Sequence, residues 1–184
     1  MRRMLLLLAS MTSLAAAACS NSTGGSGGPG VDAGQPADAC VAFQSDADLT
    51  APTVAFSTDI LPTFQRSCGI AGSTCHGARS VTTQQRPFLG FPDGGTDAGE
   101  IVSDIVGVAA NEDPSLNLVV AGDPGQSYLM HKLDGDVCQF AAACAQGPTQ
   151  YTDCGQQMPY SSPPLDESTR DVVRRWIAQG AQSN

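Results

Sequence analysis

The sequence predicts an all-α domain that follows a flexible N-terminal segment. Phe56, Ile60 and Phe64 recur every four residues, which is the spacing of one helix face. A second helical stripe lies near the C-terminus, as Val172, Val173, Trp176 and Ile177. No segment shows a long alternation of apolar and polar residues, the pattern of a half-buried strand. Helices are therefore expected to form most of the regular structure.

Residues 1–18 have the pattern of a bacterial lipoprotein signal peptide, with a basic start, an apolar run and small residues before Cys19. The run A-A-A-C resembles the site at which a cysteine is diacylated and becomes the new N-terminus. Leu14 stands five places before Cys19 rather than the usual three, so cleavage without lipidation is the alternative. The apolar run is too short to span a bilayer. Lipid on Cys19 would anchor the protein to the bacterial cell envelope, on the periplasmic or cell-surface side.

Residues 19–50 are rich in Gly, Ser, Pro and Ala and predict a disordered tether, in which Cys40 is the residue expected to be pinned down. Residues 51–184 form the predicted folded domain. The formal net charge is −9, and it becomes −11 when Arg2 and Arg3 leave with the signal peptide. Such an acidic chain is a poor partner for nucleic acid and suits a basic protein partner.

The first predicted helix contains the Phe56 stripe, with Thr58 or Asp59 as its cap and Pro62 in its first turn. It ends at Cys68. A short second helix is expected within residues 99–110, where a second apolar pattern occurs.

Asp123 and Pro124 predict the start of a third helix, whose apolar face carries Tyr128, Leu129 and Leu133. Residues 134–164 are expected to form a long loop. The last helix begins after Asp166, its predicted cap, and Gly180 ends it. Arg174 and Arg175 lie away from its apolar face and are expected to point to water.

Cys68, Cys75 and His76 lie in one short segment with the spacing C-x6-C-H. Two cysteines with a histidine directly after the second can hold a c-type haem through two thioether bonds and an imidazole ligand. The usual spacing is C-x-x-C-H, and Gly69 and Gly72 would allow the longer loop to bulge. The alternative is a disulfide between Cys68 and Cys75. Zinc is a weaker alternative, because the spacing matches no common zinc motif.

Several motifs occur in one order along the chain: the helix that ends in C-x6-C-H-G, then G-D-P-G-Q-S-Y-L-M-H-K-L-D-G from Gly122, then Met158-Pro159, then R-R-W-I-A-Q-G-A from Arg174. Together they resemble the cytochrome c domains of planctomycete and myxobacterial exported proteins, over about residues 53 to 182. This resemblance implies a small cytochrome c-like helical bundle with long cysteine-containing loops.

In that family the histidine after the second cysteine is the proximal haem ligand, and the methionine before proline is the distal ligand. The resemblance therefore implies haem c on Cys68 and Cys75, with His76 and Met158 as axial ligands, and single-electron transfer with a redox partner protein. His131 is a rival distal ligand, although a solvated surface position is the expectation for it. The alternative function is a haem-free, disulfide-stapled binding or structural module of the same fold.

The chain has seven cysteines, of which six remain if Cys19 is lipidated. An even number in an exported chain implies pairing. The disulfide candidates outside the C-x6-C-H segment are Cys40, Cys138, Cys144 and Cys154. No set of serine, histidine and acid indicates nucleophilic catalysis, so an enzyme is not expected.

Overall fold

The computed structural model describes residues 40–69, 75–79, 87–91, 94–146 and 154–184. Within these ranges the chain forms helices, loops and three isolated β-bridges, and no strand. The prediction of a mainly helical domain is therefore confirmed for the described part of the chain. The signal peptide, Cys19 and the tether up to residue 39 lie outside the described residues.

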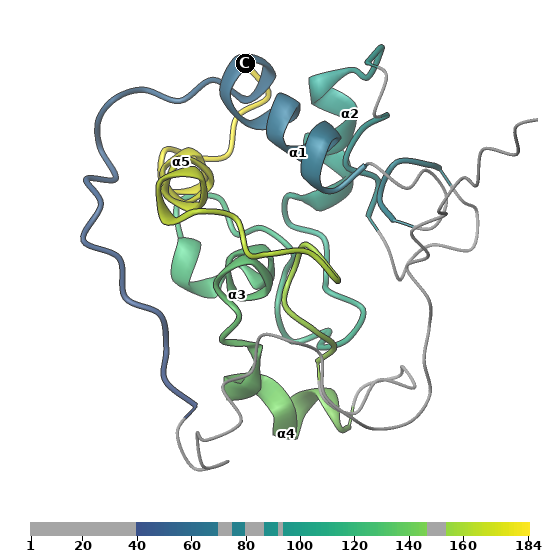
Figure 1. The fold of residues 1–184 in the computed structure, drawn as a ribbon, viewed down its shortest axis with the longest axis vertical. Coiled ribbons are helices and arrows are strands. Elements are labelled where there is room, and N and C mark those ends of the chain that lie inside the picture. The colour runs from purple at the N-terminus through teal and green to yellow at the C-terminus, as the bar shows by residue number, and fades with distance from the viewer. Residues whose placement is uncertain (1–39, 70–74, 80–86, 92–93, 147–153) are drawn as a thin grey trace, which may run out of the picture.

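The helices follow one another in the order shown in Figure 1, where η denotes a π-helical or 3-10 turn. They are η1 (Phe56–Ile60), α1 (Leu61–Ser67), α2 (Ala98–Ile105), η3 (Pro124–Gln126), α3 (Tyr128–Asp134), η4 (Val137–Phe140), α4 (Ala141–Cys144) and α5 (Glu167–Ala178).

The first helix begins earlier than the predicted cap at Thr58 or Asp59. Its opening N–H groups are satisfied by Asn184: Ser57 donates to the Asn184 main-chain oxygen at 2.9 Å, and Phe56 donates to the Asn184 side chain at 3.0 Å. The Asp59 carboxylate accepts from the N–H of Ala55, the residue just before the helix, at 2.8 Å. The first N–H groups of a helix have no partner within the helix. Here Asn184, at the other end of the chain, accepts from two of them.

The middle of the chain differs from the prediction in two places. Asp123 does cap a turn, by accepting from Gln126, but this turn is the short η3 and α3 begins only after Ser127. The segment 134–164, expected to be a long loop, contains η4 and α4. Gly135 ends α3 in the left-handed conformation, with φ of 80°, which glycine adopts at no steric cost.

The main hydrophobic core lies between α5, α3, α2 and the first helix. α5 packs against α3 and against η1 (Figure 1). Trp176 of α5 is buried, and its ring centroid lies 5.0 Å from that of Phe56. A second, smaller cluster lies around η4 and α4, with Ala110, Tyr128, Val137, Cys144 and Cys154 as its buried members.

α5 starts where the sequence predicts, since Asp166 accepts from the Thr169 N–H at 2.8 Å. The expectation that Arg174 points to water is wrong. Its side chain is buried and donates to Asp134 of α3 at 2.8 Å, and Arg170 donates to the other oxygen of the same carboxylate at 2.7 Å. The two arginines thus join α5 to α3.

Two disulfides involve the four candidate cysteines outside the C-x6-C-H segment. Cys40 is bonded to Cys138, and Cys144 is bonded to Cys154. The prediction of disulfides that fasten the segment before Met158 is confirmed. The pairing also shows that Cys40 attaches the N-terminal segment to the domain.

Residues 40–49, which the sequence places in the tether, run along the outer side of α5 and contact Asp136 just after α3; they are here called the N-terminal strap (Figure 1). Ser45 donates to Asp171 of α5 at 2.8 Å, and Arg175 donates to the Asp48 carbonyl at 2.7 Å. Residues 40–49 are therefore in ordered contact with the domain, rather than part of a disordered tether as the sequence predicts.

We predict that the capping of α5 by Asp166 weakens at low pH. Hydrogen bonds from Ser168 and Thr169 lower the pKa of Asp166 from 3.8 to about 2. A carboxyl whose folded pKa is depressed stabilises the fold above its unfolded pKa, and this contribution is lost as the pH falls from 3.8 towards about 2. Asp166→Ala should lower stability to urea at neutral pH, by an amount that shrinks across this window.

Asp166→Asn is the matched control, because asparagine also caps helices but carries no charge. It should keep most of the stability at neutral pH. A difference between Asp166→Ala and the parent protein that is the same at pH 7 and in strong acid would contradict the assignment.

Candidate functional site

The two ends of the C-x6-C-H segment meet in space. The His76 N–H donates to the Cys68 carbonyl at 3.0 Å, so the residues on either side of the widened loop are joined by a backbone hydrogen bond. Residues 70–74 of that loop lie outside the described residues. Cys68, at the end of α1, is thereby brought beside the Cys75-His76 pair.

Glycines make this meeting close. A Cβ on Gly77 would lie 2.1 Å from the Gly69 carbonyl oxygen, and a Cβ on Gly69 would lie 2.6 Å from the Gly90 oxygen. Both distances are far below a van der Waals contact, so neither position accepts a side chain without movement of the backbone. The glycine of C-H-G thus has a packing role beside the histidine.

The imidazole of His76 is oriented by a backbone carbonyl. Its Nδ1 lies 2.8 Å from the Pro87 oxygen. A carbonyl only accepts, so Nδ1 carries the hydrogen, and in the neutral ring Nε2 then carries the lone pair. Histidines that bind metals typically donate their second ring N–H to a carbonyl or carboxylate in this way, which fixes the tautomer and the ring direction. The Leu89 N–H also donates to the His76 carbonyl, at 2.9 Å.

Cys68 is a free thiol in the main core cluster, where Phe64, Phe88 and Leu89 are also buried. Burial raises the pKa of the Cys68 thiol to about 12, because the thiolate is poorly solvated there. The sulfur is therefore protonated at neutral pH and unreactive as long as the core is closed.

Cys75 is disulfide-bonded, whereas Cys68 is free. The two cysteines are therefore not bonded to each other, and the predicted alternative of a Cys68–Cys75 disulfide is absent from the structure. The backbone hydrogen bond that joins the segment, rather than a covalent bond between its thiols, holds its two ends together.

Met158 is held over the same core by α3. It is half-buried and packs against the cluster that contains Cys68. Its N–H donates to the Lys132 carbonyl at 2.8 Å, and the Gln157 side chain donates to the Leu133 carbonyl at 3.1 Å. The segment after Cys154 thus folds back onto the C-terminal turn of α3, next to the core in which α1 ends.

Tyr128 and Lys132 provide a second anchor for this segment. The Tyr128 hydroxyl and the Lys132 ammonium both donate to the Cys154 carbonyl, at 2.9 and 2.8 Å. The two residues are four apart on α3 and therefore share one helix face. This is the structural use of the S-Y-L-M-H-K-L motif, and sequence reasoning assigned no such role to Lys132.

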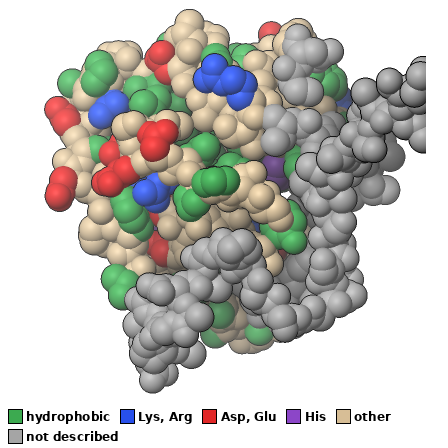
Figure 2. Space-filling view, viewed as in Figure 1, with side chains coloured by type: hydrophobic (Ala, Val, Ile, Leu, Met, Phe, Trp, Pro, Cys, Tyr) green, Lys and Arg blue, Asp and Glu red, His purple; other side chains and the backbone are tan. Residues whose placement is uncertain are grey.

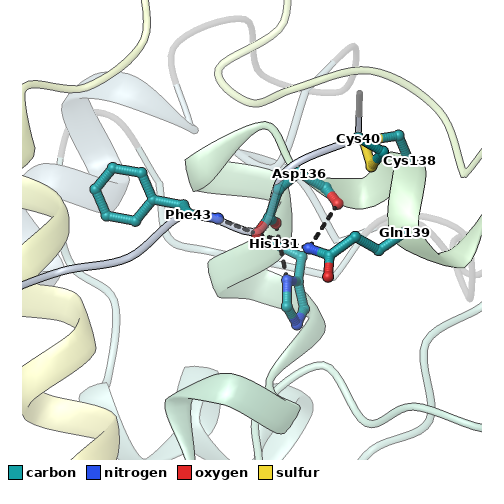
Figure 3. Close-up of a disulfide and its surroundings, with 6 residues drawn as sticks. All are labelled: Cys40, Phe43, His131, Asp136, Cys138 and Gln139. Carbon is teal, nitrogen blue, oxygen red and sulfur yellow. Dashed lines mark hydrogen bonds and ion pairs between the residues drawn. A yellow bond between two sulfur atoms is a disulfide. The ribbon is translucent and has the colours of Figure 1, made fainter. Parts of the chain in front are cut away.

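His131 is engaged through both ring nitrogens, as Figure 3 shows for Asp136. Nδ1 lies 2.8 Å from Asp136, and Nε2 lies 3.1 Å from the Gly125 carbonyl. Burial on its own lowers the pKa of His131, but the hydrogen bond and charge of Asp136 outweigh it and the net shift is upward. Binding of a metal by His131 would require loss of one of these contacts.

Comparison with known proteins gives no relative. No family model matches the chain, and no curated protein or solved structure matches it. Among the described residues, no group of three or more His, Cys, Asp or Glu side chains is arranged to hold a metal ion. The chemistry of the site thus has to be argued from Cys68, Cys75, His76 and Met158 themselves.

We predict that Gly77→Ala disrupts the contact between the two ends of the segment. The added Cβ overlaps the Gly69 carbonyl, and such overpacking typically costs about 1 to 3 kcal/mol. Unfolding in urea, followed by Trp176 fluorescence, measures the loss.

Gly125→Ala is the matched control, since a Cβ there meets only the Asp123 side chain at 3.4 Å, an ordinary contact. Equal midpoints for Gly77→Ala and the parent protein would show that the close approach is not required.

Proposed function

We propose that the chain is an extracytoplasmic, membrane-tethered protein with a cytochrome c-like domain that carries one haem c and transfers single electrons. The observation that carries this proposal is the hydrogen bond between His76 Nδ1 and the Pro87 carbonyl. It gives the imidazole the tautomer and the support that a metal ligand requires. The motif order Cys, Cys-His-Gly, Met-Pro supports the same conclusion.

The donor set fits the group. The sulfurs of Cys68 and Cys75 would add to the vinyl groups, and His76 and Met158 would supply an imidazole and a thioether as ligands. The bound haem would supply a one-electron couple between Fe(III) and Fe(II). Cys75 fits with its disulfide reduced, because thioether formation needs the free thiol.

Each residue then has a separate task. His76 is oriented by Pro87, and Met158 is positioned by the Lys132 carbonyl. A thioether ligand stabilises the reduced iron relative to a second imidazole. The core cluster that contains Cys68 would exclude water on its side of the site, and its buried members include Phe64, Phe88, Leu89, Ile101 and Leu133.

A second candidate function is supported by Cys75. Cys75 is disulfide-bonded and the Cys68 thiol is buried in the main core, so in the described state neither sulfur is available to attach a haem. A haem-free, disulfide-stapled module that binds a partner or serves a structural purpose is the alternative. Haem attachment distinguishes the two functions.

The proposed partner is a redox protein with a basic surface. The chain carries a formal net charge of −9, which attracts a basic protein and repels nucleic acid. On the face drawn in Figure 2, Lys and Arg side chains are scattered among acidic and apolar ones and form no continuous patch.

We predict that haem attachment depends on His76 and not on His131. Expressed with haem-attachment machinery, the parent protein should gain the mass of one haem after denaturation. His76→Ala should lose that gain, because attachment uses the C-H pair. The control His131→Ala removes only contacts to Asp136 and Gly125 and should keep the haem. Intact mass and absorption spectra are measured, and an unmodified parent mass would favour the haem-free module.

A second pair of variants tests the distal ligand. Met158→Leu and Met130→Leu both remove a thioether at nearly constant volume, and Met130 is a buried core residue. Only Met158→Leu should abolish the weak near-infrared sulfur-to-iron band and lower the reduction potential. Retention of that band in Met158→Leu would assign the sixth position to another residue.

The membrane attachment is proposed to be a lipid on Cys19. None of the helices in the described ranges is both long and apolar enough to cross a bilayer. Diacylation consumes the Cys19 thiol, so the lipidated protein requires Cys75 to be released from its disulfide, as haem attachment does. We predict that the mature N-terminus, analysed by mass spectrometry, is a diacylated Cys19, and that Cys19→Ser moves the protein to the soluble fraction. An unacylated N-terminus at another residue would remove the membrane assignment.

A further inference from the structure

The two described disulfides differ in their access to solvent. Cys144 and Cys154 are almost completely buried, with exposed fractions of 1% and 0%. Cys40 and Cys138 are both exposed. Thiol–disulfide exchange needs in-line access of an attacking thiolate to a sulfur atom, so exposed disulfides are the ones that react. A reductant of protein size can therefore reach Cys40–Cys138 and not Cys144–Cys154.

The Cys40–Cys138 bond holds the N-terminal end of the strap. Close to it, the strap makes one backbone hydrogen bond to the domain, from the Phe43 N–H to Asp136 at 2.9 Å (Figure 3). The Phe43 ring also lies 4.4 Å from the Arg170 guanidinium carbon. Val41, which lies between Cys40 and Phe43 in the sequence, is 69% exposed. The covalent bond is thus the main attachment of this end.

The other end of the strap is held without a covalent bond. Arg175 donates to the Asp48 carbonyl at 2.7 Å, and Gln179 donates to the Leu49 and Pro52 carbonyls at 3.3 and 3.0 Å. Gln179 also accepts from the Val54 N–H at 2.9 Å. α5 therefore retains residues 48–54 whatever happens at Cys40.

The core does not depend on the strap. Both hydrophobic clusters are built from residues at or after Val54, and no strap residue belongs to either. Asp136 keeps hydrogen bonds to His131 and to Gln139 if Phe43 leaves. Opening of residues 40–45 removes the hydrogen bonds from Phe43 to Asp136 and from Ser45 to Asp171, together with the Phe43 ring contacts to two arginines, but it removes no residue from either hydrophobic cluster.

We propose that Cys40–Cys138 is an exchangeable disulfide and that a dithiol reductant uses it to release residues 40–45 of the strap from an intact domain. A thiolate of the dithiol attacks one sulfur of the bond and displaces the other cysteine as a thiolate, which takes up a proton. The second thiol of the dithiol then resolves the mixed disulfide. Two electrons and two protons pass to Cys40 and Cys138, and the dithiol leaves as a disulfide.

Release has a local consequence on α5. The Phe43 ring covers the guanidinium groups of Arg170 and Arg174, whose carbons lie 4.4 and 5.1 Å from the ring centroid. Reduction uncovers these two cations, together with Asp134 between them. The face of α3 and α5 under the strap is thereby opened by a redox reaction rather than by unfolding.

Differential alkylation tests the first part of the proposal. The folded protein is titrated with dithiothreitol, alkylated and mapped by peptide mass spectrometry. Cys40 and Cys138 should be modified at concentrations that leave Cys144 and Cys154 unmodified. Reduction of all four at the same concentration, or of Cys144–Cys154 first, would overturn the proposal.

Amide hydrogen exchange tests release. After reduction the Phe43 amide should exchange about tenfold faster or more, whereas the Val54 amide, held by Gln179, should be unchanged. Unchanged protection of Phe43 would show that the strap stays docked, and a matching increase at Val54 would show general loosening. Either result contradicts a local release.

The double variant Cys40→Ser/Cys138→Ser reproduces the reduced state without a reductant. It should fold with the near-ultraviolet signal of Trp176 intact and show fast exchange at Phe43. Failure of this variant to fold would overturn the claim that the domain is independent of the bond. The experiment needs no haem, so its outcome is separate from that of the proposed function.

Discussion

The Cys154 carbonyl is the point on which the placement of the candidate distal ligand depends. The Tyr128 hydroxyl and the Lys132 ammonium both donate to it, and Lys132 is 8% exposed. A buried ammonium must keep its hydrogen bonds or pay a large desolvation penalty, so this contact resists removal. The Lys132 carbonyl then fixes Met158 through its N–H. Lys132 thereby holds both ends of the segment from Cys154 to Met158. The disulfide to Cys144 also fixes the Cys154 end of this segment.

A second set of charges joins α3 to α5. Asp134 accepts from Arg170 and Arg174, and burial raises its pKa more than the two guanidinium groups lower it. The Arg170 Nε and the Arg174 Nη1 are buried without a hydrogen-bond partner. Phe43 of the strap lies over both guanidinium groups, and an aromatic face attracts a cation that is incompletely hydrogen-bonded. The Phe43 ring of the strap therefore adds to the compensation that Asp134 and Asp171 give these arginines from α3 and α5.

Local signals were sufficient for some elements and insufficient for others. α5 was predictable, because its cap, its apolar stripe and its terminating glycine are all within the segment. The burial of Arg174 was not predictable, because its partner Asp134 lies 40 residues away in the sequence and the spacing of apolar residues gives no sign of this ion pair. The start of the first helix depends on Asn184, and the orientation of His76 depends on a backbone oxygen, which leaves no trace in side-chain patterns. The cysteines were identified from the sequence, but their pairing required the fold.

The Cys40–Cys138 bond also determines how the domain carries mechanical load. The two cysteines are separated by 98 positions, so a pull on the N-terminal chain enters the domain at η4 and bypasses everything between them. For a pull applied at Cys40, the bypassed part includes α1 and α2. While the bond is intact, tension applied at Cys40 is borne by the helices after Cys138. Breaking the bond would place α1 and α2 in the line of force.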